Sequence, residues 1–322
     1  MPESSPASGS GTPELHTDTA PTMTTPSMGS GVSRRGLLLA GLAGAGGLAL
    51  AACSADAQPL SGVADVSTGP AAPATGGASS APSAGARPTA AVMSTRATVP
   101  VLCYHQVRPW TGGDAAYARS MLVIPPTQLA AQLDAIKAAG YTTISPQQYR
   151  DHLFADAALP TKPVILSLDD GKDNQVSAAL PALTQRGMTG TFFVMTVILG
   201  NSGWMKRDDV KRLADAGMTI GSHTWDHHMV TKYSGKDYAT QLDQPREVLR
   251  KLSGQPVDDF AYPYGAWNTA ILPHIASAGY QAAYQLMDKP MDKGHPELTL
   301  RRILAVSTWS GPQVVAKLDS LT

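Results

Sequence analysis

The chain has 322 residues, of which 43% are hydrophobic and 16% are charged, and its formal net charge is zero. This length is sufficient for one large domain or two small ones, and the zero net charge gives no support for nucleic acid or an anionic surface as a partner. The two cysteines, Cys53 and Cys103, lie far apart in the sequence, which excludes a disulfide framework or a cysteine zinc site.

Residues 1–52 are predicted to form an export signal. A segment rich in Ser, Thr, Pro and Gly leads to Arg34 and Arg35, and a Gly/Ala/Leu stretch then runs to residue 52. Paired arginines before a diluted apolar core resemble a twin-arginine signal. The sequence Leu-Ala-Ala before Cys53 is typical of a bacterial lipoprotein processing site, so we expect an exported protein whose lipidated Cys53 anchors it to the outer face of the cell membrane. The alternative is an uncleaved transmembrane anchor, for which about 17 apolar residues is marginal.

Residues 53–98 are dominated by Ala, Pro, Ser, Gly and Thr, and they are predicted to be a disordered tether. The folded domain is therefore expected at residues 99–322. Cys103 is then the one thiol of that domain, and a lone thiol in an apolar strand is most simply explained by core packing. No protein partner is predicted.

Short apolar segments alternate with segments of helical period throughout the folded domain. We expect strands at residues 99–104, 141–144, 163–168, 189–194 and 218–222, with weaker candidates at 260–262, 280–284 and 301–306. Helices are expected between them: one capped by Thr127, one at 146–154, one ending at Gly187, one containing Val210 and Leu213, a long segment reaching Leu252 that starts afresh at Pro245, one from Asn268 and one at 313–318. Seven or eight strands alternating with helices predict an α/β fold with a parallel barrel, and a doubly wound open sheet is the alternative.

Polar or aromatic residues follow four of the predicted strands. His105 follows the first, Asp169 and Asp170 the third, His223 the fifth, and residues 262–265 the sixth. In a parallel barrel the carboxyl ends of the strands meet at one face, where catalytic groups gather. The sequence therefore predicts an active site built from these four strand ends.

His223 and His227 are four residues apart and can converge on one cation together with a carboxylate from the Asp pair. Such a His-His-Asp set leaves positions open for water and substrate. Zinc is the expected ion for a hydrolytic site of this type, while cobalt, nickel and manganese remain open. His228 is the alternative to His227 on sequence alone.

Three motifs carry a family resemblance. Residues 167–171 (Ser-Leu-Asp-Asp-Gly), 223–227 (His-Thr-Trp-Asp-His) and 260–265 (Phe-Ala-Tyr-Pro-Tyr-Gly) resemble motifs of the polysaccharide deacetylases, carbohydrate esterase family four. The resemblance covers residues 99–322. It implies a distorted (β/α) barrel of about seven parallel strands and metal-dependent removal of acetyl groups from N-acetylated sugars.

The resemblance also implies roles for individual residues. Asp169 would be the general base that activates water, and Asp170, His223 and His227 would hold the metal. The main-chain amide of Tyr264 would help to stabilise the oxyanion.

The chain departs from the family pattern at two places. Many members have an arginine where Ala261 stands, and Arg301 or Arg302 is the candidate substitute. Many also have a late general-acid histidine that has no counterpart here. Residues 104–107 instead resemble the branch that deacetylates poly-N-acetylglucosamine, which makes His105 the candidate general acid. His274 and His295 are the alternatives.

Trp225, Tyr262, Pro263 and Trp267 flank the motifs and are candidates for substrate binding, because aromatic faces stack on sugar rings. Ordinary packing is the alternative for each. The sequence as a whole favours an N-deacetylase acting on an amino-sugar polymer such as poly-N-acetylglucosamine, peptidoglycan or a chitin-like chain. An O-acetyl esterase acting on xylan is the second hypothesis. A catalytically weak carbohydrate-binding relic, motivated by Ala261 and the missing late histidine, is the third.

Overall fold

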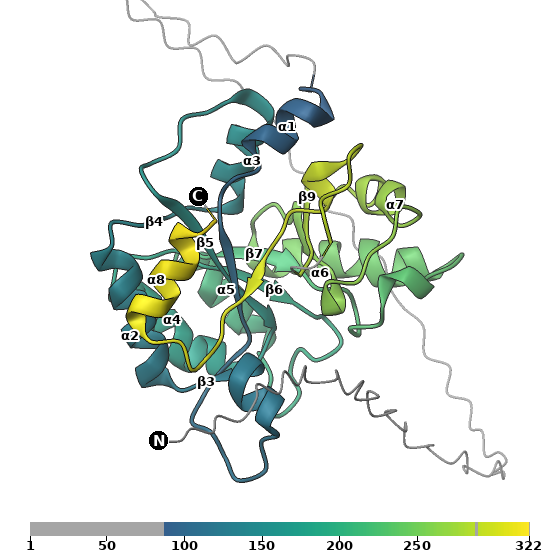
Figure 1. Ribbon diagram of the computed structural model, residues 1–322. Helices are drawn as coiled ribbons and strands as arrows, with labels where there is room; N and C mark the ends of the chain where they lie inside the picture. The colour runs from purple at the N-terminus through teal and green to yellow at the C-terminus, as the bar shows by residue number, and fades with distance from the viewer. Residues whose placement is uncertain (1–86, 287–288, 322) are drawn as a thin grey trace, which may run out of the picture. The chain divides into compact units, whose positions relative to one another are not determined.

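The computed structural model describes residues 87–286 and 289–321 (Figure 1). The predicted export signal, Cys53 and most of the predicted tether lie outside the described residues. Among the described residues, no helix combines the length and apolarity needed to cross a membrane.

The folded region begins before residue 99. Helix α1, Ala90–Arg96, lies within the segment predicted to be tether, and Thr89 caps it by accepting a hydrogen bond from the amide of Val92. Its Met93 is buried, and the guanidinium of Arg87 lies 4.2 Å from the ring centre of Phe154. The sequence did not predict this helix because the segment contains few large apolar residues. A single buried methionine is sufficient to anchor it.

Seven parallel strands form one curled sheet in the order β10, β1, β5, β6, β7, β8, β9. Their bounds are Ile303–Leu304, Val101–Tyr104, Pro163–Asp170, Thr191–Val194, Thr219–Ser222, Asp259–Ala261 and Ala282–Tyr284. Strand β4, Thr142–Thr143, pairs with the start of β5 away from this path. A separate two-stranded parallel sheet, β2 (Gln106–Val107) with β3 (Val123–Ile124), follows β1.

The sheet curls far enough for its two edges to meet. An isolated parallel bridge joins Tyr284 at the end of β9 to Leu300, three residues before β10 begins. The amide of Gln285 donates to the Leu300 carbonyl at 2.9 Å, and the amide of Leu300 donates to Ala283 at 2.9 Å. The expected distorted barrel with about seven parallel strands is thereby confirmed, and the open doubly wound sheet is not what forms.

Helices cover the outside of this barrel. Helix α2 (Pro126–Ala138) lies beside α8 (Gly311–Asp319), as Figure 1 shows, although the two are far apart in the sequence. The remaining helices are α3 (Pro146–Ala155), α4 (Leu180–Thr184), α5 (Arg207–Asp215), α6 (Gln244–Ser253) and α7 (Leu272–Ser277). Single π-helical turns occur at Ala118–Leu122, Gln175–Ala179 and Ala239–Asp243, and 3₁₀ turns at Val230–Lys232, Pro263–Gly265 and Pro296–Leu298.

Two helix predictions need correction. Helix α2 begins at Pro126 with Pro125 at its N-cap position, so Thr127 lies inside the first turn, where proline is well tolerated because its missing amide needs no partner there. The long helix expected after β7 begins only at Ala239, and residues 223–229 are non-helical. These are the residues that carry the second predicted motif.

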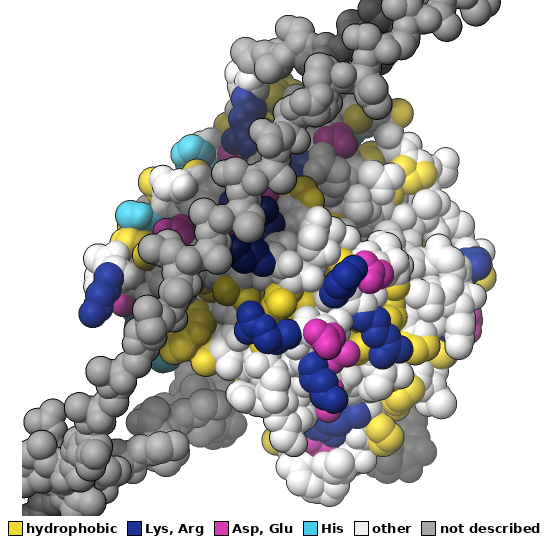
Figure 2. Space-filling model, turned by 180° about the vertical axis from the view of Figure 1, so that it is seen from behind, with side chains coloured by type: hydrophobic (Ala, Val, Ile, Leu, Met, Phe, Trp, Pro, Cys, Tyr) yellow, Lys and Arg dark blue, Asp and Glu magenta, His cyan; other side chains and the backbone are white. Residues whose placement is uncertain are grey.

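The face of the molecule in Figure 2 shows Lys and Arg side chains interspersed with Asp and Glu. This mixture agrees with the zero net charge of the chain. The face shown presents no single-sign patch of the type that binds nucleic acid.

Candidate active site

Asp170, His223 and His227 come together at the carboxyl ends of β5 and β7. We call them the Asp-His group. The Oδ1 atom of Asp170 lies 3.6 Å from the Nε2 atom of His223 and 3.6 Å from the Nε2 atom of His227. The three donor atoms all lie within 4.8 Å of one another. The sequence expectation that these three residues converge agrees with this geometry.

The spacing of the Asp-His group fits a divalent ion. Bonds of about 2.0–2.1 Å in tetrahedral geometry place neighbouring donor atoms roughly 3.4 Å apart. Two of the three edges, at 3.6 Å, are close to that value. Two imidazoles and one carboxylate also form the donor set of many hydrolytic metal sites, which leave a position open for substrate.

The histidines of this group are poised to donate lone pairs. The Nδ1–H of His223 can donate to the carbonyl of Ala261 at 2.8 Å, which leaves Nε2 unprotonated and directed at Asp170. Burial lowers the pKa of the buried His223, although Asp169 and Asp170 oppose this effect. Burial and the neighbouring His223 lower the pKa of His227 to about 4. Both imidazoles are therefore neutral at neutral pH, as a metal ligand must be.

The backbone at the site is unusual. Asp170, Thr224, His227 and Tyr264 all have positive φ angles, between 59° and 81°, although none of them is glycine. Such conformations cost of order 1–3 kcal/mol each and persist where surrounding contacts fix them. One such contact is the hydrogen bond from the amide of His227 to Oγ1 of Thr224, at 2.9 Å. Four such residues around one point indicate that the surrounding contacts fix the directions of these side chains.

Asp169 lies beside the Asp-His group but has different partners. Its carboxylate accepts two hydrogen bonds from the guanidinium of Arg302, at 2.6 and 2.7 Å, and both side chains are almost completely buried. Burial by itself raises the pKa of Asp169, but Arg302 and His223 outweigh burial and hold that pKa well below its usual range. Asp169 is therefore ionised at neutral pH, with one oxygen 3.8 Å from Nε2 of His223.

Arg302, the residue before β10, supplies the positive charge that the third motif lacks. Arg302 also donates to Oγ of Ser167 at 3.2 Å and to the carbonyl of Gln285 at 3.3 Å, so its orientation is fixed. Ala261, where many members of the resembling family have arginine, offers only its carbonyl, to His223. Arg302, rather than Arg301, is the residue that pairs with Asp169.

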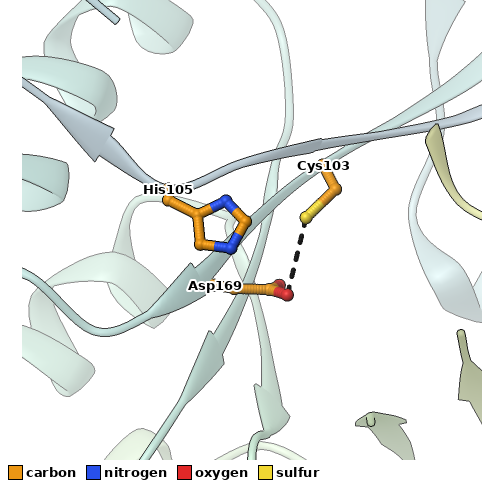
Figure 3. Close-up of side chains that lie close together, drawn as sticks. All are labelled: Cys103, His105 and Asp169. Carbon is orange, nitrogen blue, oxygen red and sulfur yellow. Dashed lines mark hydrogen bonds between the residues drawn. The ribbon is translucent and has the colours of Figure 1, made fainter. Parts of the chain in front are cut away.

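Figure 3 shows Cys103 and His105 directed at Asp169. The thiol of Cys103 donates to Oδ2 of Asp169 at 3.5 Å, and burial raises the pKa of this thiol, so it remains protonated. Donor atoms of Cys103, His105 and Asp169 lie within 4.8 Å of one another. Cys103 is buried as expected, but it contacts the carboxylate in addition to packing in the core.

Comparison with known proteins agrees with this arrangement. A sequence model of the family described as polysaccharide deacetylase matches residues 156–283, which contain both aspartates and both histidines of the site. Residues 156–283 of the chain therefore belong to the polysaccharide deacetylase family.

Individual relatives are distant. The Bacillus subtilis protein YxkH, assigned to the polysaccharide deacetylases, is 23% identical over 225 residues, which are 70% of this chain and 77% of YxkH. A peptidoglycan-N-acetylglucosamine deacetylase of Bacillus cereus is 33% identical over 103 residues, only 36% of that protein. The structure of IcaB from Ammonifex degensii is similar with a TM-score of 0.57 at 26% identity, covering 69% of this chain and 97% of that one.

One residue of this deacetylase site has no signal in the sequence motifs. The buried Gln175 lies in the π-helical turn after β5 and donates both to the carbonyl of Asp169 and, at 2.8 Å, to the carbonyl of His105. It joins the backbones of the two candidate proton-transfer residues, which come from different strands.

The rival histidines lie elsewhere. His228 is largely exposed, and its Nδ1 lies 2.7 Å from the Oδ2 of Asp226. His274 stacks on the ring of Tyr238 at 3.6 Å, and His295 lies 3.8 Å from Glu297. None of the three belongs to either titratable cluster found among the described residues. The geometry favours His227 over His228 and His105 over the other two.

The predicted sugar contacts divide into one exposed and three buried side chains. Trp225 is 39% exposed and lies between the two histidines in the sequence. Tyr262 is fully buried, its hydroxyl donates to the carbonyl of Leu298, and the neighbouring Pro263 is also buried. The indole N–H of the buried Trp267 donates to the side-chain oxygen of Gln285, and the ammonium of Lys289 lies over its ring. These three therefore support the loop rather than offer a face to a sugar. The ring of Tyr264 is 62% exposed and contacts the ring of His227 at 4.5 Å between centres.

Proposed function

We propose that the protein is a divalent-metal-dependent hydrolase that removes N-acetyl groups from an amino-sugar polymer. The observation that carries the proposal is the juxtaposition of two differently equipped carboxylates. Asp170 faces two neutral histidines, while Asp169, the next residue, is held ionised by Arg302 at 3.8 Å from one of those histidines. Family membership supports the reaction type.

The fit of the Asp-His group to an ion defines the first part of the mechanism. Asp170, His223 and His227 would hold the ion, with zinc the expected choice for this donor set. When bound, such an ion polarises the acetamide carbonyl and lowers the pKa of water.

Asp169 is proposed to accept the proton of the attacking water. Arg302 fixes the carboxylate so that Oδ2 lies 3.8 Å from Nε2 of His223, a member of the Asp-His group. The ion pair with Arg302 makes Asp169 a weaker base than a free carboxylate. Its contribution therefore depends on its orientation and its proximity to the water rather than on its intrinsic basicity.

Two further groups complete the reaction. Water adds to the amide carbon, the C–N bond breaks, and the products are acetate and a free sugar amine. His105 is proposed to protonate the departing nitrogen, since its ring lies over Asp169 and Gln175 fixes its backbone. The main-chain amide of Tyr264 is proposed to donate to the developing oxyanion, because this residue lies against His227.

The proposed substrate is a polymer of N-acetylated amino sugars, namely poly-N-acetylglucosamine, peptidoglycan or a chitin-like chain. The Bacillus cereus relative that acts on peptidoglycan N-acetylglucosamine supports this class. We also propose that the protein is exported and anchored through a lipid on Cys53, for which the sequence of residues 33–53 is the support. Loss of membrane fractionation in Cys53→Ser would test this anchor.

Acetate release tests the proposed activity. The metal-loaded protein should release acetate from N-acetylglucosamine oligomers, and a chelator should stop the release. Acetate from acetylated xylan alone would instead indicate an O-acetyl esterase. Glycan binding without acetate release under zinc, cobalt, nickel or manganese would indicate a binding relic.

A further inference from the structure

A second group of possible metal ligands lies beside the Asp-His group. Donor atoms of Cys103, His105 and Asp169 all lie within 4.8 Å of one another, and Figure 3 shows the thiol and the imidazole directed at the same carboxylate. We call these three residues the Cys103 site. It shares no side chain with the Asp-His group, so an ion in one group does not take a ligand from the other.

The separation of sulfur and oxygen in the Cys103 site fits a bridging ion. The Sγ atom of Cys103 lies 3.5 Å from Oδ2 of Asp169. A tetrahedral zinc ion with bonds of about 2.3 Å to sulfur and about 2.1 Å to oxygen holds these two atoms roughly 3.5–3.7 Å apart. Cys103 and Asp169 lie on β1 and β5, which are paired neighbours in the sheet. An ion that replaced the thiol proton would therefore reach both atoms with little movement of either strand.

His105 supplies the third ligand. It follows β1 directly, it is half-buried, and Gln175 holds its backbone. The buried Nδ1 of its ring has no hydrogen-bond partner in the described part of the chain. Buried polar atoms are almost always paired, so this unpaired nitrogen independently indicates that the ring binds a further group. One cysteine is sufficient for such a site, because an imidazole and a carboxylate are also ligands of zinc.

Charge makes the Cys103 site weaker than the Asp-His group. The guanidinium of Arg302 donates to both oxygens of Asp169, at 2.6 and 2.7 Å, and so places a positive charge near the ion. The thiol must also lose its proton before it can bind a metal. We therefore expect the Asp-His group to fill first and the Cys103 site to fill only when the metal is in excess.

We propose that the Cys103 site is a second, inhibitory site for zinc or another thiophilic divalent ion. When the ion binds, the S–H bond breaks, its proton passes to water, and the ion takes the place of the proton between the sulfur and Asp169. The inhibition rests on the proposed deacetylase function, because the ion occupies both the proposed base, Asp169, and the proposed acid, His105. The binding of the ion does not rest on that function.

A cobalt titration tests the binding without turnover. The protein carries Cys53→Ser, which leaves Cys103 as the one thiol of the chain. A thiolate-to-cobalt charge-transfer absorption band should appear as the second equivalent of cobalt binds. Cys103→Ala should abolish this band and weaken the second ion by about tenfold or more, since even the partners of metal ligands contribute that much affinity. The first ion should remain. His228→Ala is the matched control and should keep the band, because this exposed histidine pairs with Asp226.

Excess zinc tests the inhibition. Protein with about one zinc ion per chain should release acetate, further zinc should reduce the turnover, and removal of the excess should restore it. In Cys103→Ala the zinc concentration that halves the turnover should rise by about tenfold or more. Cys103→Ser replaces the sulfur by a hydroxyl of similar size, and it should give the same result if the alanine variant does not fold.

The outcomes separate the site from the activity. A wild-type thiol that gives no charge-transfer band in excess cobalt would show that Cys103 only packs in the core, and this result would overturn the site. Equal inhibition by zinc in the wild type and in both Cys103 variants would overturn the inhibitory role. A band that depends on Cys103 supports the site even if no acetate is released, in which case the proposed function alone fails.

Discussion

Asp169 and Asp170 are neighbours in the sequence, yet their surroundings are opposite. Asp169 is almost completely buried, and its carboxylate accepts hydrogen bonds from Arg302 and Cys103. Asp170 has a left-handed backbone, a side chain that is 20% exposed, and two neutral imidazoles within 3.6 Å. The change of backbone conformation at the end of β5 directs the two carboxylates to different partners, so one pair of identical side chains supplies both a fixed anion and an open ligand.

The largest expected effect comes from dismantling the Asp-His group. In His223→Ala we expect bound zinc to fall from about one ion per protein to near zero and acetate release to fall to background, because one of three protein ligands is lost. Metal analysis and the acetate assay measure the two effects. His228→Ala is the matched control, since this exposed histidine pairs with Asp226, and it should keep both. Full activity in metal-free protein would contradict the mechanism.

Replacing each aspartate separately tests whether the two carboxylates have different roles. Asp169→Asn should lower kcat by about 10²–10⁴-fold and retain the metal, because a proton acceptor is lost while the Asp-His group is intact. Asp170→Asn should instead lower the metal content. Equal metal loss in both variants would show that the two carboxylates do not have separate roles.

Replacing His105 tests its proposed role as the acid that protonates the departing amine. His105→Ala should lower turnover by about 10²-fold or more with the metal retained, as expected for the loss of a general acid. A substrate with a better leaving group, such as an activated acetate ester, should be affected much less. If both substrates lost activity equally, His105 would have a structural role instead.

Arg302→Met leaves a buried carboxylate without its partner, which typically costs about 3–5 kcal/mol of unfolding free energy. Urea unfolding measures this change. The double variant Asp169→Leu with Arg302→Met should regain most of the stability but none of the activity, because an apolar pair of similar volume removes the unpaired charge. A stable and fully active Arg302→Met variant would show that this ion pair is dispensable.

The smallest effect is expected at Cys103. Its thiol is a weak donor at 3.5 Å from Asp169, so Cys103→Ala should change kcat by only about two- to threefold. The expected loss of stability is comparable to that of a small cavity and is measurable by thermal unfolding. A large loss of activity at unchanged stability would give this thiol a greater role in orienting the base.

Much of this arrangement could be predicted from local sequence. The strand at Pro163–Asp170 and the motif His223 to His227 are recognisable because hydrophobic period and residue spacing are local properties, and the barrel follows from their alternation. The pairing of Asp169 with Arg302 joins residues 133 positions apart, so sequence could offer Arg301 and Arg302 only as candidates. The role of Gln175 could not be predicted for the same reason, because its side chain joins segments that are distant in the sequence. The burial of Tyr262 and Trp267 depends on the loops packed over them, which no local pattern encodes.

The bridge at Leu300 has a consequence for how the protein becomes active during synthesis. Arg302 follows the residue that closes the ring, so the counter-charge for Asp169 arrives with the last strand of the barrel. A nascent chain lacking that strand would carry every residue of the Asp-His group but leave its neighbouring anion unneutralised in an open-edged sheet. The ion pair that fixes Asp169 therefore forms only when the last strand of the barrel is in place.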